Sequence, residues 1–306
     1  MSEHVPVLLH EVVTFLDPHP GDFIIDGTVD GGGHAREILG RITDTGTLLG
    51  TDWDETLLAE CRERLVGYKN AVLVHANYAD LAQVLEAQAR EGRVPKAQAD
   101  GLLVDLGFSS EQLARSGRGF SFGARGEEGS HNEPLLMTYD DSKTPVATLL
   151  RELPEATLAD IIFEFGGERY SRRIAKAIKE RERKTPIATN GELAAIVRAA
   201  LPARYEHGRI DPATRTFQAL RIYANGELEN LEALLAHVPD IVRPGGRVAI
   251  ITFHSLEDRI VKRAFRALAT EGKAHLITKK PIPAGRDEIA ENPRSRSAKL
   301  RVIQLS

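Results

Sequence analysis

The stretch Asp26-Gly27-Thr28-Val29-Asp30-Gly31-Gly32-Gly33-His34 decides the fold of this 306-residue chain. It follows the apolar run 23–25 and leads into a helix-like segment at 35–39. The order strand, glycine loop, helix is typical of a cofactor site, because glycines let a ligand approach the backbone and helix N–H groups face it. The stretch contains neither Gly-x-Gly-x-x-Gly nor Gly-Lys-Ser/Thr, which disfavours dinucleotides and nucleoside triphosphates.

A second apolar run, 47–51, ends in Asp52. An acid at the tip of the second strand of such a fold can accept hydrogen bonds from two ribose hydroxyls. A ribose carboxylate beside a glycine loop without a phosphate-binding lysine suggests S-adenosylmethionine. Asp26 would organise the loop and approach the amino acid part of this cofactor. Tyr78 would lie along the adenine or, alternatively, belong to the core.

Apolar runs alternate with helix-like segments over most of the chain. Besides the first two, the runs cover 71–74, 101–104 and 247–252, and helix-like segments cover 55–65, 81–90 and 225–242. Nearly continuous apolar strands separated by helices predict an α/β fold with a parallel sheet covered on both faces. The runs 275–277 and 300–305 predict an antiparallel pair at the sheet edge.

The strand pattern is interrupted between about residue 113 and residue 214. In that interval, 156–165, 171–182 and 191–201 are predicted to be helices. We therefore predict one domain built from 1–112 and 215–306, with an inserted, mostly helical substrate-recognition domain at 113–214.

Composition narrows the class of protein. The chain is 42% hydrophobic, which is enough for a buried core, and it contains no apolar run long enough to span a membrane. Its N-terminus lacks the features of a signal peptide. The single cysteine, Cys61, excludes internal disulfides and a multi-cysteine zinc site, and we interpret it as a small buried side chain. We expect a cytoplasmic protein without membrane attachment, and we name no metal ligand.

The net charge of −4 is distributed unevenly along the sequence. Twelve Lys or Arg stand against four Asp or Glu in 259–301, and eight stand against three in 168–184. Each block would provide a basic surface suited to a polyanion, whereas the alternative for each is a solvated helix face.

The fourth apolar run ends in a turn rich in functional groups: Asp105, Ser109, Ser110 and Gln112. Methyl transfer from a sulfonium is a direct displacement, so the enzyme must mainly align the nucleophile. The exocyclic amine of a base is a poor nucleophile because its lone pair is delocalised into the ring. Hydrogen bonds from the amine to Asp105 and a carbonyl would favour pyramidalisation, and Asp105 would later accept a proton. Alternatively, Asp105 caps the next helix and the serines form the turn.

Two further segments contain candidate substrate residues. His254 follows the fifth apolar run, where it would touch substrate or only bond a backbone carbonyl. Arg294 and Arg296 lie in Asn292-Pro293-Arg294-Ser295-Arg296-Ser297-Ala298-Lys299, whose cations and small hydroxyls suit phosphate contacts that position RNA without reading its sequence.

With these segments placed, the chain closely resembles the bacterial 16S rRNA (cytosine-N4)-methyltransferase family, also called MraW or RsmH. The likeness runs from His4 almost to Ser306. The stretches that carry it are 26–34, 103–110 with Gln112-Leu113, 212–221 and 253–259, supported by 118–122 and 292–301.

The resemblance implies a Rossmann-like class I methyltransferase sheet with an inserted helical domain. It implies N4-methylation of a decoding-region cytidine of 16S rRNA in the small ribosomal subunit, with S-adenosylmethionine as cofactor, by a monomer or homodimer. By the family's motifs, the cofactor would be held by Gly32, Gly33, His34, Asp52, Tyr78 (usually phenylalanine), Asp105 and Gln112. Asp26 and Gly31, which lie in the glycine loop, are also predicted to bind the cofactor.

The chain departs from the family pattern in two places. Asp30 stands where the family usually has glycine, and it adds bulk and negative charge near the cofactor. Leu136 and Thr138 replace a carboxylate and a guanidinium. These departures leave open a rival interpretation: a catalytically impaired RNA-binding or ribosome-assembly protein that keeps the methyltransferase fold.

Overall fold

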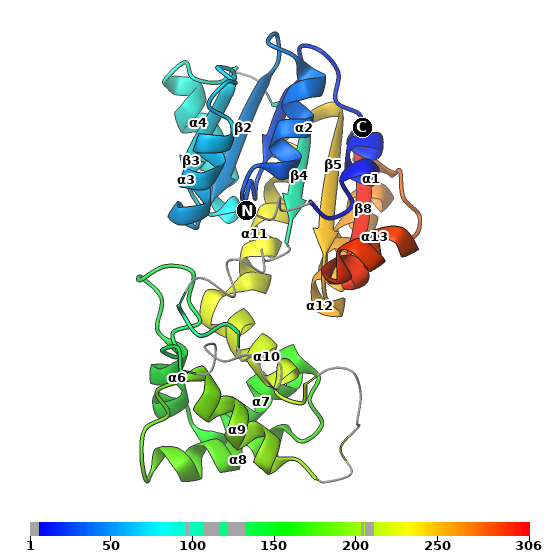
Figure 1. Cartoon of the computed structure of the whole chain (residues 1–306). Helices are drawn as coiled ribbons and strands as arrows, with labels where there is room; N and C mark the ends of the chain where they lie inside the picture. Colours follow the sequence, from blue (N-terminus) through cyan, green and yellow to red (C-terminus); the bar gives the residue numbers. More distant parts are fainter. Residues whose placement is uncertain (1–5, 96–97, 107–116, 122–131, 203–204, 206–210) are drawn as a thin grey trace. The chain divides into compact units, whose positions relative to one another are not determined.

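The computed structural model describes residues 6–95, 98–106, 117–121, 132–202, 205 and 211–306, apart from the side chain of Arg294. The chain forms two compact units, Met1–Gly107 with Leu228–Ser306 and Phe108–Glu227, which we call the sheet unit and the inserted unit (Figure 1). Sequence patterns place the second end of the insertion at residue 214. The inserted unit extends to Glu227 instead, because helix α10 (Thr214–Asn225) contributes Phe217 and Leu220 to its core.

The sheet unit contains one sheet with the strand order β3-β2-β1-β4-β5-β8-β6. Its strands are β1 (Phe23–Asp26), β2 (Thr47–Asp52), β3 (Ala71–His75), β4 (Ala99–Asp105), β5 (Val242–Thr252), β6 (Ala274–Leu276), β7 (Ile282–Pro283) and β8 (Lys299–Leu305). β1 to β5 are parallel, and β8 runs antiparallel to β5, β6 and β7. The predicted parallel sheet with a late antiparallel pair is confirmed.

Successive strand residues point to opposite faces of this sheet, as strand geometry requires. Ile25 and Leu49 pack in one buried cluster, whereas their neighbours Ile24 and Leu48 pack in another. Because both faces are apolar, both must be covered. The first cluster includes residues of α4 (Leu81–Arg90), α11 (Glu227–Ile241) and α12 (Ser255–Thr270). The second includes residues of α1 (Leu9–Leu16), α2 (Gly33–Ile42) and α3 (Glu55–Arg64).

The alternating pattern locates most of these helices but not all of them. α4 begins and ends as predicted, whereas α1, α12 and the short α13 (Arg286–Glu291) are not predicted. α12 has a strong polar and apolar division, with Val261 and Phe265 buried. Among the described residues, no helix combines the length and apolarity needed to cross a membrane.

The inserted unit consists of helices around its own core. They are α6 (Val146–Glu152), α7 (Glu155–Gly166), α8 (Ser171–Glu182), α9 (Asn190–Ala200) and α10. α7, α8 and α9 confirm the three predicted helices, while α6 and α10 are not predicted. A Cβ atom on Gly166 would lie 2.4 Å from the carbonyl oxygen of Arg215, so glycine is required where α7 approaches α10.

Candidate functional site

Three predicted site residues lie at one edge of the sheet. Asp26, Asp52 and Asp105 end β1, β2 and β4, which are adjacent parallel strands. Their exposed fractions are 0%, 5% and 7%. The sheet therefore gathers the three carboxyl groups at the end where α/β proteins bind ligands. We call this group, together with Asp30, the acidic edge.

The loop after β1 is tied to both neighbouring strands. The N–H of Val29 donates to the carbonyl of Thr51 over 2.9 Å. The N–H of Asp105 donates to the Thr28 hydroxyl over 2.7 Å. These bonds fix the loop that sequence analysis assigned to the cofactor.

Asp52 joins the two loops of the acidic edge. One carboxylate oxygen accepts the N–H of Asp30 and the other accepts the N–H of Asp54, each over 2.9 Å. Each oxygen keeps a second lone pair, so the two ribose hydroxyls of a nucleoside remain possible donors. The ribose role of Asp52 stays a prediction, and its loop-bridging role was missed because it depends on contacts between two loops.

One carboxylate oxygen of Asp26 has no hydrogen-bond partner among the described residues. Its Oδ1 accepts the N–H of Thr28 over 3.2 Å, while its buried Oδ2 has no partner among the described residues. Burial raises the pKa of Asp26 to about 7; the Thr28 bond opposes this, and the charges of Asp105 and Asp52 add to it. Leaving a buried acceptor unpaired costs free energy. The atom is therefore suited to accept a hydrogen bond from a ligand.

The acidic edge favours a cation. Burial, and then the charge of Asp52, raises the pKa of Asp30 well above its ordinary value. Burial raises the pKa of Asp52 to about 6, although its two backbone hydrogen bonds lower it. Carboxylates that repel one another in a poorly solvated site gain from a positive charge nearby. A ligand with a sulfonium or ammonium group meets this requirement.

Besides the predicted approach of a cofactor, the local structure explains why glycines occur in this loop. Gly32 is the N-cap of α2 at φ 83°, and a Cβ there would lie 3.0 Å from Cys61 Sγ. A Cβ on Gly33 would lie 2.4 Å from Pro6. Gly31 is less crowded, since Arg64 is 3.6 Å away. Their contact with a cofactor stays a prediction.

Cys61 is buried, and burial raises the pKa of its thiol to about 12. The thiol therefore stays protonated at neutral pH. This agrees with the interpretation of Cys61 as a small buried side chain.

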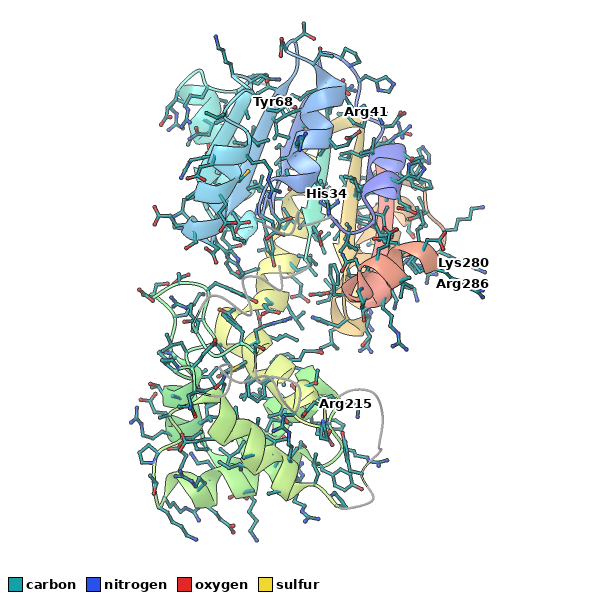
Figure 2. The ribbon with its side chains drawn as sticks, in the orientation of Figure 1. His34, Arg41, Tyr68, Arg215, Lys280 and Arg286 are labelled. Atoms are coloured by element: carbon teal, nitrogen blue, oxygen red, sulfur yellow. The ribbon has the colours of Figure 1, made fainter. Side chains whose placement is uncertain are left out.

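His34 lies in the first turn of α2, close to the acidic edge (Figure 2). Its Nε2 is 3.0 Å from the carbonyl oxygen of Val7, and its Nδ1 is 3.9 Å from Asp105 Oδ2. The histidine thus contacts the N-terminal segment and lies near the proposed catalytic carboxylate, and its contact with a cofactor stays a prediction.

Tyr78 begins the 3₁₀ helix η1 (Tyr78–Asp80) after β3. It is 6% exposed and belongs to the sheet core, in keeping with the alternative that sequence analysis left open. Its ring centroid lies 6.0 Å from that of Trp53. Trp53, the only tryptophan in the chain, directly follows Asp52 and was missed as a site residue. It provides an intrinsic fluorescent probe of this edge.

His254 is the N-cap of α12. Its Nδ1 is 3.5 Å from the N–H of Glu257, and the Glu257 carboxylate accepts the N–H of His254 over 3.2 Å. Sequence analysis left a structural role open, and this is such a role; the substrate contact stays a prediction. Arg296 is exposed in the 3₁₀ helix η2 (Pro293–Ser297). Ser109, Ser110 and Gln112, and the side chain of Arg294, lie outside the described residues.

The departures at Leu136 and Thr138 lie in the inserted unit. Thr138 is buried, and the Arg118 guanidinium donates to its hydroxyl over 3.1 Å and to its carbonyl over 2.6 Å. The N–H of Val146 donates to the carbonyl of Leu136. Both residues are therefore integrated into the local structure of this unit.

The chain is similar in sequence to proteins of one known family. The chain matches the MraW methylase family over residues 1–306. The ribosomal RNA small subunit methyltransferase H of Geobacter sp. (strain M21) is 43% identical over 318 residues, 98% of each chain. The protein of that name from Syntrophus aciditrophicus (strain SB) is 43% identical over 320 residues, 99% of this chain and 98% of the relative. An rRNA methylase structure from Streptococcus thermophilus aligns with a TM-score of 0.42 and 11% identity, over 99% of this chain and 98% of that one.

Proposed function

Because the chain belongs to the MraW methylase family, we propose that it methylates the N4 amine of a cytidine in the decoding region of 16S rRNA. Family membership establishes the coarser activity: the chain is an S-adenosylmethionine-dependent rRNA methyltransferase. The target atom, the nucleotide and the roles of individual residues are our proposal. The acidic edge is the observation that carries the assignment of the site.

The residues of the acidic edge fit S-adenosylmethionine. Asp52 would hold the ribose through the free lone pairs of its two oxygens. Asp26 Oδ2, which lacks a partner among the described residues, would accept a hydrogen bond from the cofactor's ammonium group. The raised pKa values of Asp26 and Asp52 reflect burial and repulsion by neighbouring carboxylates, and a cationic ligand would offset that repulsion.

Asp105 is the proposed catalytic residue. The bound cofactor supplies an electrophilic methyl group and becomes an uncharged thioether. Asp105 would accept a hydrogen bond from the cytidine amine, which localises the nitrogen lone pair for attack. When the N–C bond has formed, the same carboxylate takes up the proton that leaves N4. The N–H of Asp105 is held by Thr28, and His34 lies beside its carboxylate, so the side chain is well positioned.

The target base must leave its stack for the amine to reach this carboxylate. Enzymes that modify nucleobases commonly turn the base out of the nucleic acid. A decoding-region loop of rRNA, with bases not fully stacked, lowers the cost of that step. Ser109, Ser110 and Gln112 are proposed to complete the catalytic turn and the cofactor contacts, and His254, Arg294 and Arg296 to contact RNA.

The direct test uses purified protein, labelled S-adenosylmethionine and small ribosomal subunits that lack the modification. We expect N4-methylcytidine by mass spectrometry of the digested rRNA, and no product with Asp105→Ala. Asp44→Ala, which removes an exposed carboxylate in the same unit, is the matched control and should retain activity. A methyl group on another atom would refute the assignment.

The rival function is a catalytically impaired RNA-binding or assembly protein. Titration calorimetry with S-adenosylmethionine separates the two, because a protein that has lost turnover through Asp30 would bind the cofactor poorly. We expect micromolar binding. Retained RNA affinity with no detectable cofactor binding would favour the rival.

A further inference from the structure

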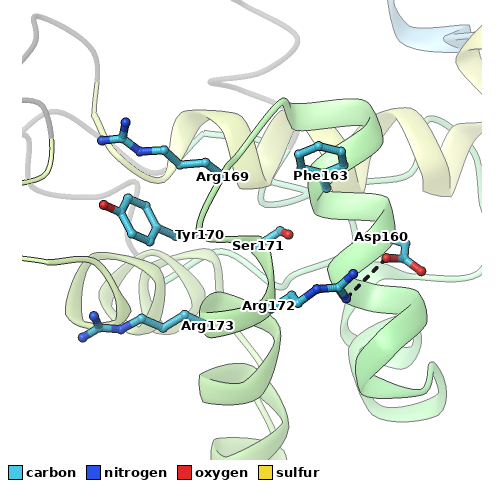
Figure 3. Close-up of a pocket in the computed structure, with 7 residues that line it drawn as sticks. All are labelled: Asp160, Phe163, Arg169, Tyr170, Ser171, Arg172 and Arg173. Atoms are coloured by element: carbon cyan, nitrogen blue, oxygen red, sulfur yellow. Dashed lines mark ion pairs between the residues drawn. The ribbon is translucent and has the colours of Figure 1, made fainter.

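The inserted unit contains a hollow of about 350 Å³ that the catalytic assignment does not use (Figure 3). It lies where α7, the turn at 167–170 and the first turn of α8 meet. Its main lining side chains are Asp160, Phe163, Arg169, Tyr170, Arg172 and Arg173. We propose that this hollow binds a single-stranded segment of rRNA, with a base stacked on its aromatic surface and phosphates held by its arginines. This inference rests on the proposed function, since it supplies an RNA contact for the same substrate.

The charge of the lining suits an anion. Three arginines and one carboxylate, Asp160, line the hollow. Arg172 lies 3.6 Å from that carboxylate, but the two side chains are 79% and 59% exposed, so their pairing is weak. Arg169 and Arg173 have no ion-pair partner within the described ranges. Guanidinium groups bind phosphate oxygens through paired hydrogen bonds, which makes them preferred phosphate ligands.

An exposed aromatic ring accompanies these cations. Phe163 is 58% exposed, so its ring is accessible to a base in solution. In the same lining, the guanidinium carbon of Arg169 lies 5.0 Å from the centre of the Tyr170 ring. Aromatic rings and arginine planes are the surfaces on which proteins stack unpaired RNA bases. The combination therefore matches a nucleotide better than it matches a simple anion.

The wall of the hollow is held in place from behind. Glu168 is fully buried and accepts the N–H of Tyr170 over 2.8 Å and the hydroxyl of Tyr205 over 2.5 Å. The Tyr205 ring lies 5.7 Å from that of Tyr170, and Arg215 is 4.0 Å from the Glu168 carboxylate. A turn that is already ordered loses little entropy when a ligand binds.

The surroundings favour a polymer over a single phosphate or nucleotide. Lys176, Arg183 and Lys184 are exposed on α8 and just after it, beyond the hollow. The segment 168–184 carries an excess of five positive charges in a chain with a net charge of −4. Lys176 is 3.9 Å from the exposed carboxylate of Glu180, a weak surface pair. Exposed cations on the same helix as a stacking site match the phosphates of an RNA backbone.

The test measures binding of a fluorescently labelled single-stranded RNA of about ten nucleotides, a length within the usual range for such sites. Fluorescence anisotropy at several salt concentrations gives the affinity and its salt dependence. The variants are Phe163→Ala, Phe163→Tyr and the double variant Arg172→Gln/Arg173→Gln. Matched controls are Val66→Ala and Arg90→Gln, which remove an 88% exposed apolar and a 74% exposed cationic side chain from the sheet unit.

We expect Phe163→Ala to weaken RNA binding by about tenfold or more, as loss of one stacked base does. Phe163→Tyr should keep the RNA affinity of the wild type, because tyrosine also stacks. The double arginine variant should reduce the slope of log affinity against log salt by about 1.4, because each phosphate contact on a single strand contributes about 0.7. S-adenosylmethionine affinity, followed by Trp53 fluorescence, should be unchanged in every variant.

The outcomes separate this inference from the proposed function. RNA binding by the variants equal to that of the wild type and the controls would overturn the inference, even if the wild type methylates ribosomal subunits. Loss of affinity for inorganic phosphate with unchanged RNA affinity would also overturn it, because the hollow would then serve a small anion. Failure of the wild type to methylate subunits would instead count against the proposed function, whatever the variants bind.

Discussion

Asp30 occupies a backbone conformation that favours glycine. Its φ of 46° lies in the left-handed region, which costs most residues with a side chain about 1–2 kcal/mol and aspartate or asparagine less. The repulsion of its carboxylate by Asp52 adds to this cost. The hypothesis to test is that Asp30, in this conformation at the acidic edge, affects the binding of a cation.

Replacing Asp30 tests the effect of its backbone conformation on stability and the effect of its charge on cofactor binding. We expect Asp30→Gly to raise the free energy of unfolding by about 1 kcal/mol or more, measured by urea denaturation at pH 8. We also expect it to reduce the preference for S-adenosylmethionine over the product S-adenosylhomocysteine, which lacks the sulfonium charge. Asp30→Asn is the control, because asparagine tolerates the left-handed region but lacks the charge. An unchanged preference in both variants would remove Asp30 from the cofactor site.

Asp52 offers a second test at the scale of one side chain. We expect Asp52→Asn to weaken S-adenosylmethionine binding by about 10- to 100-fold, because hydrogen bonds to charged groups contribute about 1.5–3 kcal/mol. The fluorescence of Trp53, the adjacent residue, provides the titration signal. Asp54→Asn is the matched control, because asparagine caps α3 as aspartate does. Equal losses in the two variants would contradict a specific ribose contact.

At the scale of an element, the start of α12 is fixed by a reciprocal cap between His254 and Glu257. The Glu257 carboxylate accepts the backbone N–H groups of Phe253 and His254, over 2.7 and 3.2 Å. The His254 side chain in turn lies against the N–H of Glu257. This reciprocal cap fixes the start of α12 directly after β5, at the edge of the sheet where Asp105 also lies.

Substitutions of His254 separate its role as the N-cap of α12 from the predicted substrate contact. We expect His254→Ala to lower the free energy of unfolding by about 1 kcal/mol, and His254→Asn to restore it, because asparagine is a strong N-cap residue. Thermal and urea unfolding measure this directly. Methylation lost in the stable asparagine variant would support a substrate contact. Full activity in that variant would leave His254 with the cap alone.

At the scale of the whole molecule, the buried carboxyl groups make stability depend on pH. Burial raises the pKa of Asp26 from 3.8 to about 7 and that of Asp52 to about 6. Between about pH 4 and pH 7 these two carboxyl groups therefore hold more protons in the folded protein than in the unfolded chain. The lowered pKa values of Asp140, Glu192 and Asp258 act in the opposite sense at the acid end of this interval. The free energy of unfolding, measured without cofactor, should fall as pH rises through this interval.

Asp26→Asn isolates the largest of these contributions. The amide oxygen can still accept the N–H of Thr28, but the buried group no longer ionises. We expect the variant to lose less stability between pH 5 and pH 8, by up to a few kcal/mol, because a tenfold change in an ionisation constant corresponds to about 1.4 kcal/mol. Urea unfolding across this interval is the measurement. Parallel pH profiles for wild type and variant would show that Asp26 is not the titrating group.

The charge of the whole chain also differs from that of its parts. A net charge of −4 does not suggest a nucleic-acid partner, yet the sheet unit places carboxylates at the acidic edge while the segment 168–184 of the inserted unit is basic. The two charge distributions suit a cationic cofactor and an anionic polymer respectively. The sign of the net charge is therefore a poor guide to the partners of this protein.

Local patterns in the sequence predict much of the fold. The boundaries of α4 and α8 follow from the spacing of their apolar residues, and the parallel sheet follows from short apolar runs separated by helices. The loop at 26–34 and Asp52 predicted the edge of the sheet at which the acidic edge is found. These features depend on residues close together in the chain, so the sequence shows them directly.

The tertiary structure decided the rest. Thr28 and Asp105, 77 residues apart, meet only because β4 lies beside β1. The Asp26 oxygen that lacks a partner among the described residues is buried, and burial together with the charges of Asp105 and Asp52, distant in sequence, raises the pKa of its carboxyl group. The hollow beside Phe163 likewise exists only where two helices and a turn meet. Burial and hydrogen bonding depend on which distant residues come into contact, and no local pattern specifies that.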